Sequence, residues 1–73
     1  MTDKRPFDML NSIIGEHVIV KLREGSDITG TLDSFDVHMN VVLDNAGESK
    51  GNKYGQLILR GDNIVFIAPI SKE

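Results

Sequence analysis

Hydrophobic and polar residues follow two different periods along this chain, which divide it into a helical start and a β-rich remainder. Phe7, Leu10 and Ile14 recur at the spacing of one face of a helix. Pro6 suits the first helical position, where a missing N–H costs nothing. The pattern predicts a short helix over residues 6–14, which needs a packing partner to be stable.

From His17 onward the period changes to two, the period of a strand with one buried face. Val18, Val20 and Leu22 share one face, and clusters of turn-forming residues interrupt the alternation further along. The predicted strands begin at His17, cover residues 28–35, begin again at Val41–Leu43, and cover residues 54–59 and 64–67. Gly30, inside the second strand, indicates the bend that closing a small barrel requires.

One helix followed by five short strands predicts a single all-β domain, either a fragment of a sandwich or a small barrel. The chain has 73 residues and no cysteine. Domains of this size usually need a disulfide, a metal or a partner subunit for stability. The last strand, residues 64–67, is apolar on both faces and invites pairing with another chain. A closed ring of subunits is one arrangement that satisfies such an edge.

Composition narrows the function. The net charge is −3 and the isoelectric point is about 5.2, which argues against a broad basic surface for nucleic acid. His17 and His38 are the only soft metal ligands, so we expect neither a metal nor a cofactor. No stretch approaches the roughly 18 apolar residues of a membrane span. Residues 1–6 do not resemble a signal peptide, so a cytoplasmic protein with no membrane partner is expected.

Two segments resemble the two motifs of the Sm-like (LSm) family. The first runs from Val20 through Gly30 in the bent strand to Asp36-Val37-His38-Met39-Asn40 and the strand after it. The second is Leu59-Arg60-Gly61-Asp62-Asn63-Ile64. The two motifs stand in the family's order, with a variable loop between them and a helix before them.

The resemblance extends over nearly the whole chain. Arg5-Pro6-Phe7-Asp8 is similar to the start of the helix in archaeal Sm-like proteins. The Arg-Gly pair of the second motif differs from the Tyr-Lys-His type of bacterial members and favours the archaeal and eukaryotic type. The expected division is a single Sm-like domain over residues 1–73. Its parts are a helix at about 6–14, the first motif at about 18–44, the variable loop at about 44–53 and the second motif at about 54–68.

This resemblance implies a strongly bent, five-stranded antiparallel barrel of the Sm (SH3-like) type. It implies a homo-oligomeric ring, most often of seven subunits, joined by the fourth strand of one subunit and the fifth of the next. It also implies a partner, single-stranded uridine-rich RNA, which binds on the inner rim. The expected role is that of a scaffold or chaperone in RNA processing, with no small-molecule substrate.

Three residues of the motifs offer the chemistry that single-stranded RNA needs. His38 supplies a flat ring for stacking, and Arg60 supplies a guanidinium plane for the other face of the base. Asn40 carries a donor and an acceptor side by side. Uracil presents a carbonyl acceptor beside an imino donor, which one amide can match, whereas cytosine lacks the imino donor.

Three more motif residues have supporting parts. Asp36 and Asp62 are acceptors that would orient Asn40 and Arg60. Gly61 gives the second turn its backbone freedom and leaves room for a base. Outside the family context, each polar residue has a simpler interpretation, as a turn former or a member of a surface ion pair. Three large apolar residues are expected in the core rather than at the RNA: Phe35, Met39 and Phe66.

Three other functions compete with RNA binding by such a ring. The first is a structural ring or protein-interaction module, which the acidic balance favours. The second is an oligonucleotide-binding barrel of another topology, which the leading helix and the Arg-Gly turn disfavour. The third is an enzyme, which is disfavoured because Asp36 and His38 have no neighbouring nucleophile and no glycine-rich phosphate loop is present.

Overall fold

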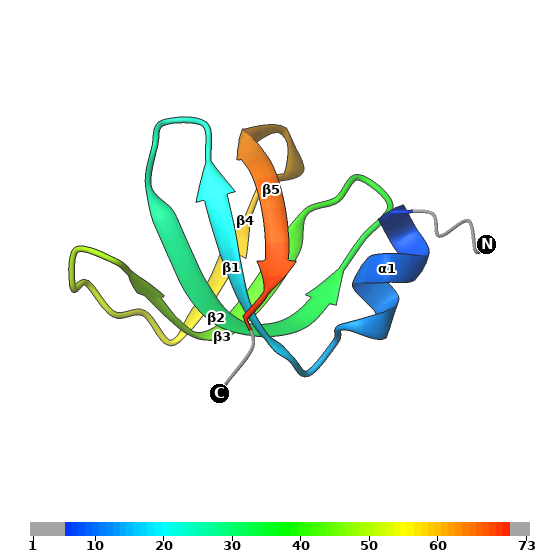
Figure 1. The fold of residues 1–73 in the computed structure, drawn as a ribbon, viewed down its shortest axis with the longest axis horizontal. Coiled ribbons are helices and arrows are strands. Elements are labelled where there is room, and N and C mark those ends of the chain that lie inside the picture. The colour runs from blue at the N-terminus through cyan, green and yellow to red at the C-terminus, as the bar shows by residue number, and fades with distance from the viewer. Residues whose placement is uncertain (1–5, 71–73) are drawn as a thin grey trace.

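The computed structural model describes residues 6–70, and these form one short helix and a single five-stranded sheet (Figure 1). The elements are α1 (Pro6–Ser12), β1 (His17–Leu22), β2 (Asp27–Phe35), β3 (Val41–Glu48), β4 (Gln56–Leu59), the 3₁₀ turn η1 (Gly61–Asn63) and β5 (Ile64–Pro69). Arg5, part of the segment that resembles an archaeal helix start, lies outside the described residues.

All neighbouring strands are antiparallel, in the order β4-β3-β2-β1-β5. The sheet curves strongly, with β4 and β5 at its two edges and α1 beside one open end (Figure 1). This confirms the predicted helix and five-stranded antiparallel barrel. Within residues 6–70 neither edge strand pairs with the other, so the barrel remains open along β4 and β5.

The core lies inside this curve and follows the predicted alternation. Val20 pairs with Ile28 on one side and with Ile67 on the other, so the three side chains point to the same face. The buried apolar residues are Leu10, Val18, Val20, Ile28, Leu32, Val41, Leu43, Ala46 and Leu59. Phe35 and Met39 pack against this cluster from its margin, as expected.

The helix is shorter than its apolar spacing predicts. It ends at Ser12, and the chain then turns through residues 13–15. Ile14 therefore does not continue the helical face and is 43% exposed. Leu10 of α1 enters the core, and Ile13, in the turn, packs against the core cluster. The predicted extent of residues 6–14 was wrong because the turn toward β1 begins two residues early.

The segment expected as a variable loop, residues 44–53, is partly strand. β3 continues to Glu48, while β4 begins at Gln56 instead of Tyr54. The hairpin between them is ordered by side chains, since the Tyr54 hydroxyl donates to Glu48 Oε2 at 2.9 Å. This hydrogen bond, together with desolvation and the Glu48 charge, raises the pKa of Tyr54, although a contact with Asn52 opposes the shift.

Phe66 was expected in the core but lies outside it. Ile67 pairs with Val20 and takes the core face, so Phe66, paired with Lys21, must point outward, and it is 49% exposed. On β4, at the opposite edge, Ile58 is 69% exposed. Both free edges of the sheet thus carry large apolar side chains at the surface. No helix within residues 6–70 is long and apolar enough to cross a membrane.

We predict that replacing Gly30 by alanine lowers the free energy of unfolding by about 1–3 kcal/mol, the usual cost of overpacking. A Cβ at Gly30 would meet the Asp44 carbonyl oxygen at 3.0 Å and the Ala46 Cα at 3.2 Å, and backbone atoms cannot easily move away. Gly55→Ala is the matched control, because nothing lies within 4 Å of a Cβ there. Chemical denaturation of both variants measures the difference; equal stabilities would show that the bend tolerates a side chain.

Candidate nucleic-acid interface

The first motif loop is a tight hairpin between β2 and β3. The backbone N–H of Met39 donates to the Asp36 carbonyl at 2.9 Å, and the N–H of Asp36 donates to the Asn40 carbonyl at 3.1 Å. Met39 closes the turn with φ of 66°, a left-handed conformation that is uncommon for a residue with a side chain. The loop therefore has a defined shape, which directs the two residues on either side of Met39.

Asp36 holds this loop through both of its carboxylate oxygens. Oδ1 accepts from the backbone N–H of His38 at 2.9 Å and of Asn40 at 3.0 Å. Oδ2 accepts from Asn40 Nδ2 at 3.2 Å. Desolvation acts to raise the pKa of Asp36, but these three hydrogen bonds and the positive charge of His38 outweigh it. The net effect is a pKa below the ordinary value, so the carboxylate stays charged.

The Asn40 side chain joins the first motif loop to the second. Its Oδ1 accepts from the backbone N–H of Gly61 at 2.8 Å, across 21 positions of sequence. The two loops are in close contact here, since a Cβ on Gly61 would overlap the His38 carbonyl oxygen and the Met39 backbone. Gly61 is thus required by space and not by the backbone freedom expected from the sequence, since its φ is not positive. Its N–H is part of the candidate site.

These two contacts set the orientation of the Asn40 amide. With Nδ2 toward Asp36 and Oδ1 toward Gly61, both ends are paired with complementary groups. A flipped amide would place its oxygen against a carboxylate and its NH₂ against an N–H, and both arrangements are repulsive. The contacts use one of the two N–H groups and one of the two lone pairs, so a donor and an acceptor remain for a ligand.

The second motif loop is held less tightly. Arg60 and Asp62 form an ion pair at 3.5 Å between Nη2 and Oδ2, and their side chains are 74% and 68% exposed. An ion pair this exposed contributes little stability, so Arg60 is able to turn toward a ligand. Arg23, the residue after β1, supports the loop: its N–H donates to the Asn63 carbonyl at 2.9 Å, and its Nη1 donates to the Asp62 carbonyl at 3.4 Å.

The structure brings the sequence-predicted residues together on the two adjoining loops, but not all by side-chain contact. Asp36, Asn40 and Gly61 form one hydrogen-bonded set, whereas Arg60 and Asp62 contact each other. His38 is exposed and joins the set through its backbone. Sequence reasoning missed Arg23, because its contact with Asp62 spans 39 positions and no local pattern signals it.

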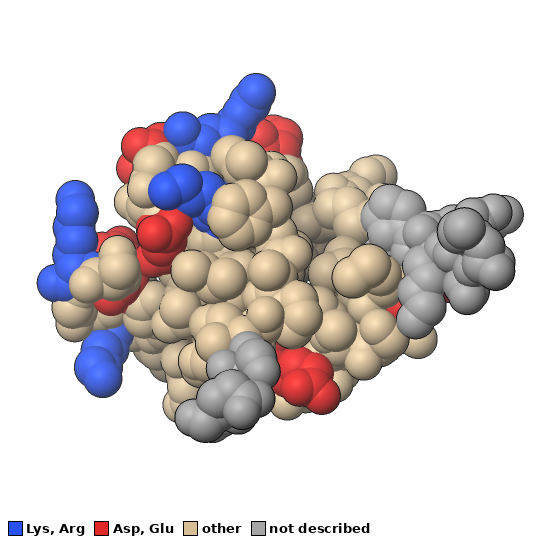
Figure 2. All heavy atoms as spheres, viewed as in Figure 1, with Lys and Arg blue, Asp and Glu red and all other residues tan. Residues whose placement is uncertain are grey.

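Charge around the fold is mixed rather than basic. Figure 2 shows Lys and Arg side chains interspersed with Asp and Glu over the β1–β2 turn and the β3–β4 hairpin, with a largely uncharged surface toward α1. In the part of the chain that the structure describes, no three histidine, aspartate or glutamate side chains are arranged to hold a metal ion. The candidate site offers the hydrogen-bonding amide of Asn40 and the exposed planar groups of His38 and Arg60.

Comparison with known proteins gives consistent results. The LSM domain family matches residues 8–69. An snRNP Sm-like protein of Methanosarcina barkeri is 42% identical over 69 residues, covering 89% of this chain and 96% of the relative. The SmAP1 heptamer of P. aerophilum superposes with a TM-score of 0.87 at 39% identity, covering 97% of this chain and 100% of that one. A Pyrococcus abyssi Sm protein in complex with a uridine heptamer superposes with a TM-score of 0.85 at 35% identity, covering 92% of this chain and 100% of that one.

We predict that the Asp36 carboxyl titrates with a midpoint below 3.8, the ordinary value for aspartate. The stability that the charged Asp36 carboxylate gives to the loop is then complete above pH 3.8. This stability is lost as the pH falls through the lower pKa of the folded state. Asn40→Ala removes the side-chain hydrogen bond and should raise the midpoint toward 3.8. Carboxyl-detected NMR titration measures both proteins. A wild-type midpoint at or above 3.8 would contradict the described set of contacts.

Proposed function

The chain belongs to the LSM domain family, and on this premise we propose that it is an RNA-binding ring subunit. It assembles into a homo-oligomeric ring of seven subunits and binds single-stranded, uridine-rich RNA on the inner rim. It acts as a scaffold or chaperone in RNA metabolism and performs no catalysis. The observation that carries the proposal is the Asn40 amide, oriented by Asp36 and Gly61 with one donor and one acceptor unused.

Assembly is supported by the two open edges of the sheet. β4 and β5 are the two edge strands of the sheet. The β4 edge of one subunit is therefore available to pair with the β5 edge of a neighbouring subunit. Repetition of this single contact is head-to-tail and closes a ring when the rotation per subunit fits. Similarity to the P. aerophilum heptamer favours seven subunits for this chain.

Uridine preference is supported by the direction of the amide. Along the pairing edge, uracil offers an acceptor at position 4 and a donor at position 3, whereas cytosine offers a donor and then an acceptor. An amide free to flip would match either base. An amide held by Asp36 and Gly61 matches one base only in a given pose. The similar P. abyssi protein in complex with a uridine heptamer favours uracil as that base.

Affinity must come from few contacts, because the chain has a net charge of −3. His38 and Arg60 are exposed, one on each loop, and both present flat groups. Stacking on such groups contributes about 1–3 kcal/mol per base and is tolerant of base identity. We therefore propose that His38 and Arg60 supply affinity, that Asn40 supplies base choice, and that Asp36, Gly61 and Asp62 position them.

A ring that binds a protein instead of RNA is the second candidate, and the negative net charge favours it. The two are separated by purification under native conditions. A ring that carries nucleic acid shows excess absorbance at 260 nm, which is easily seen because the chain has no tryptophan and one tyrosine. An RNA partner also fits the cytoplasmic location that the sequence predicts.

We predict that affinity and base preference separate by mutation. His38→Ala and Arg60→Ala should weaken oligouridine and oligocytidine binding together, by about 1–3 kcal/mol per occupied site. Asn40→Ala should lower the preference for oligouridine, because it removes a matched pair typically worth roughly 0.5–1.5 kcal/mol. Binding curves for the ring-forming variants against both oligonucleotides measure this. An Asn40→Ala ring that keeps the full uridine preference would show that another group reads the base.

We also predict that Ile58→Asp abolishes the ring. Ile58 is 69% exposed on the β4 edge, so the isolated subunit tolerates the change, but a neighbour's apolar β5 would cover the charge. Val37→Asp is the matched control, because Val37 is 74% exposed in the turn between β2 and β3, which are not edge strands. Native mass spectrometry of the three proteins gives the subunit number. A wild-type monomer at micromolar concentration, or an intact ring for Ile58→Asp, would contradict edge pairing.

A further inference from the structure

Met39 has an unusual backbone for its side chain. Its φ of 66° is the conformation that glycine or asparagine normally occupies, and a bulky side chain there is strained. Glycine at this position would form the same turn without strain. The presence of methionine therefore needs a reason that turn geometry does not provide, and its side chain is where that reason must lie.

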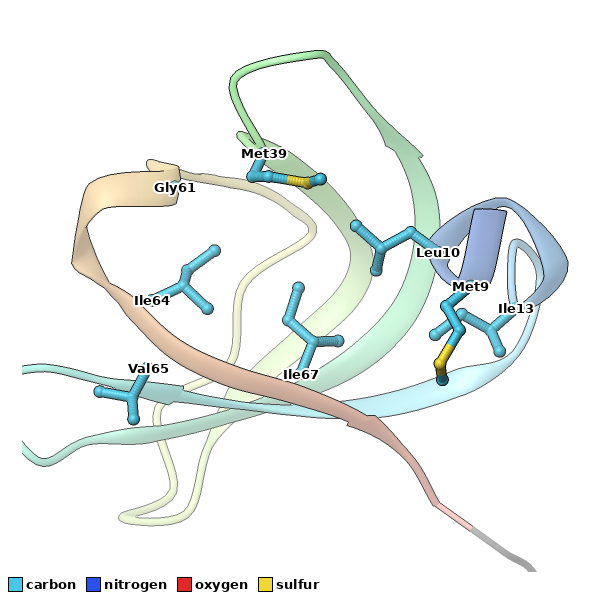
Figure 3. Close-up of a pocket in the computed structure, with 8 residues that line it drawn as sticks. All are labelled: Met9, Leu10, Ile13, Met39, Gly61, Ile64, Val65 and Ile67. Atoms are coloured by element: carbon cyan, nitrogen blue, oxygen red, sulfur yellow. The ribbon is translucent and has the colours of Figure 1, made fainter. Parts of the chain in front are cut away.

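The Met39 side chain enters an apolar hollow beside its loop. It lines an open hollow of about 480 Å³ together with Met9, Leu10 and Ile13, on or just after α1, and with residues of β5. Figure 3 shows the Met39 side chain extending from its loop into this hollow, toward Leu10. Gly61, whose N–H donates to Asn40, also lines this hollow.

Helix α1 also contacts the beginning of the same loop. The rings of Phe7 and Phe35 meet edge to face with centroids 4.9 Å apart, and Phe35 is the residue immediately before Asp36. Edge-to-face aromatic pairs have a preferred geometry as well as apolar area. The loop over residues 36–40 thus begins next to a contact with α1, that of Phe7 with Phe35, and Met39 near its other end packs against the core cluster to which Leu10 of α1 belongs.

We propose that Met39 is a positioning residue for base recognition. Its apolar anchor holds the left-handed turn in one shape, and that shape sets the directions of His38 and Asn40 on either side of it. The unbranched, flexible side chain of methionine suits an irregular hollow of this kind. The inference rests on the proposed RNA-binding function and adds a role for α1, which supports the loop that reads the base.

The test compares Met39→Gly with Met39→Leu in the assembled ring. Glycine accepts the backbone conformation and removes the anchor, whereas leucine keeps an apolar anchor of similar size. We expect Met39→Gly to weaken oligouridine binding by about tenfold, roughly the loss of one well-placed hydrogen bond, and to lower the preference over oligocytidine. Met39→Leu should restore both. NMR signals of the Asn40 side-chain NH₂ should shift in the glycine variant and return in the leucine variant.

A purely structural role for Met39 would change thermal stability without moving base preference or the Asn40 signals, and that outcome would overturn the proposal. If Met39→Gly does not form a ring, Phe7→Ala tests the same support of the loop, since Phe7 is 45% exposed and its loss leaves the core intact. Rings of Phe7→Ala that bind oligouridine as tightly as the wild type would then overturn it. Failure of the wild-type ring to bind oligouridine would instead refute the proposed function.

Discussion

The hydrogen bond from the Gly61 N–H to Asn40 Oδ1, 2.8 Å long, is the contact on which the candidate site depends. It joins the loop between β2 and β3 to the turn between β4 and β5, and it gives the Asn40 amide its direction. Asp36 completes the arrangement by binding the other end of the amide and two backbone N–H groups of its own loop. Because each partner is held by the others, Asp36, Asn40 and Gly61 are ordered before any ligand arrives, and little ordering of these three residues remains to be done on binding.

The same turn that supplies Gly61 also connects the two edge strands. η1 lies between β4 and β5, which are the strands proposed to pair with neighbours on either side. Under the proposed function, base recognition and assembly share this short segment of chain. A subunit of this size buries a small core, and its edges carry large apolar side chains, including Ile58 and Phe66. Assembly would cover this surface and place equivalent sites around one rim.

Much of the fold was predictable from local pattern. The period of two identified the buried faces of β1 and β2, and Gly30 indicated the bend in β2, where pairing with β3 shifts register between Thr29 and Thr31. Element boundaries were less predictable. The end of α1 at Ser12 and the length of β3 depend on turns and pairing with distant strands, and Phe66 faces outward because its neighbour Ile67 pairs with Val20. The motifs indicated six site residues, but the supports from Arg23 and Met39 arise from contacts and backbone angles that residue type does not reveal.

The central claim is that a directed amide reads the imino edge of uracil, and a modified ligand tests it most directly. The measurement is the affinity of the wild-type ring for oligomers of uridine, N3-methyluridine and 5-methyluridine. Methylation at N3 removes the imino donor and leaves the stacking face, whereas methylation at C5 leaves the pairing edge intact. The account predicts that the 5-methyluridine oligomer binds like oligouridine and that the N3-methyluridine oligomer binds as weakly as oligocytidine. Equal affinity for the uridine and N3-methyluridine oligomers would contradict it.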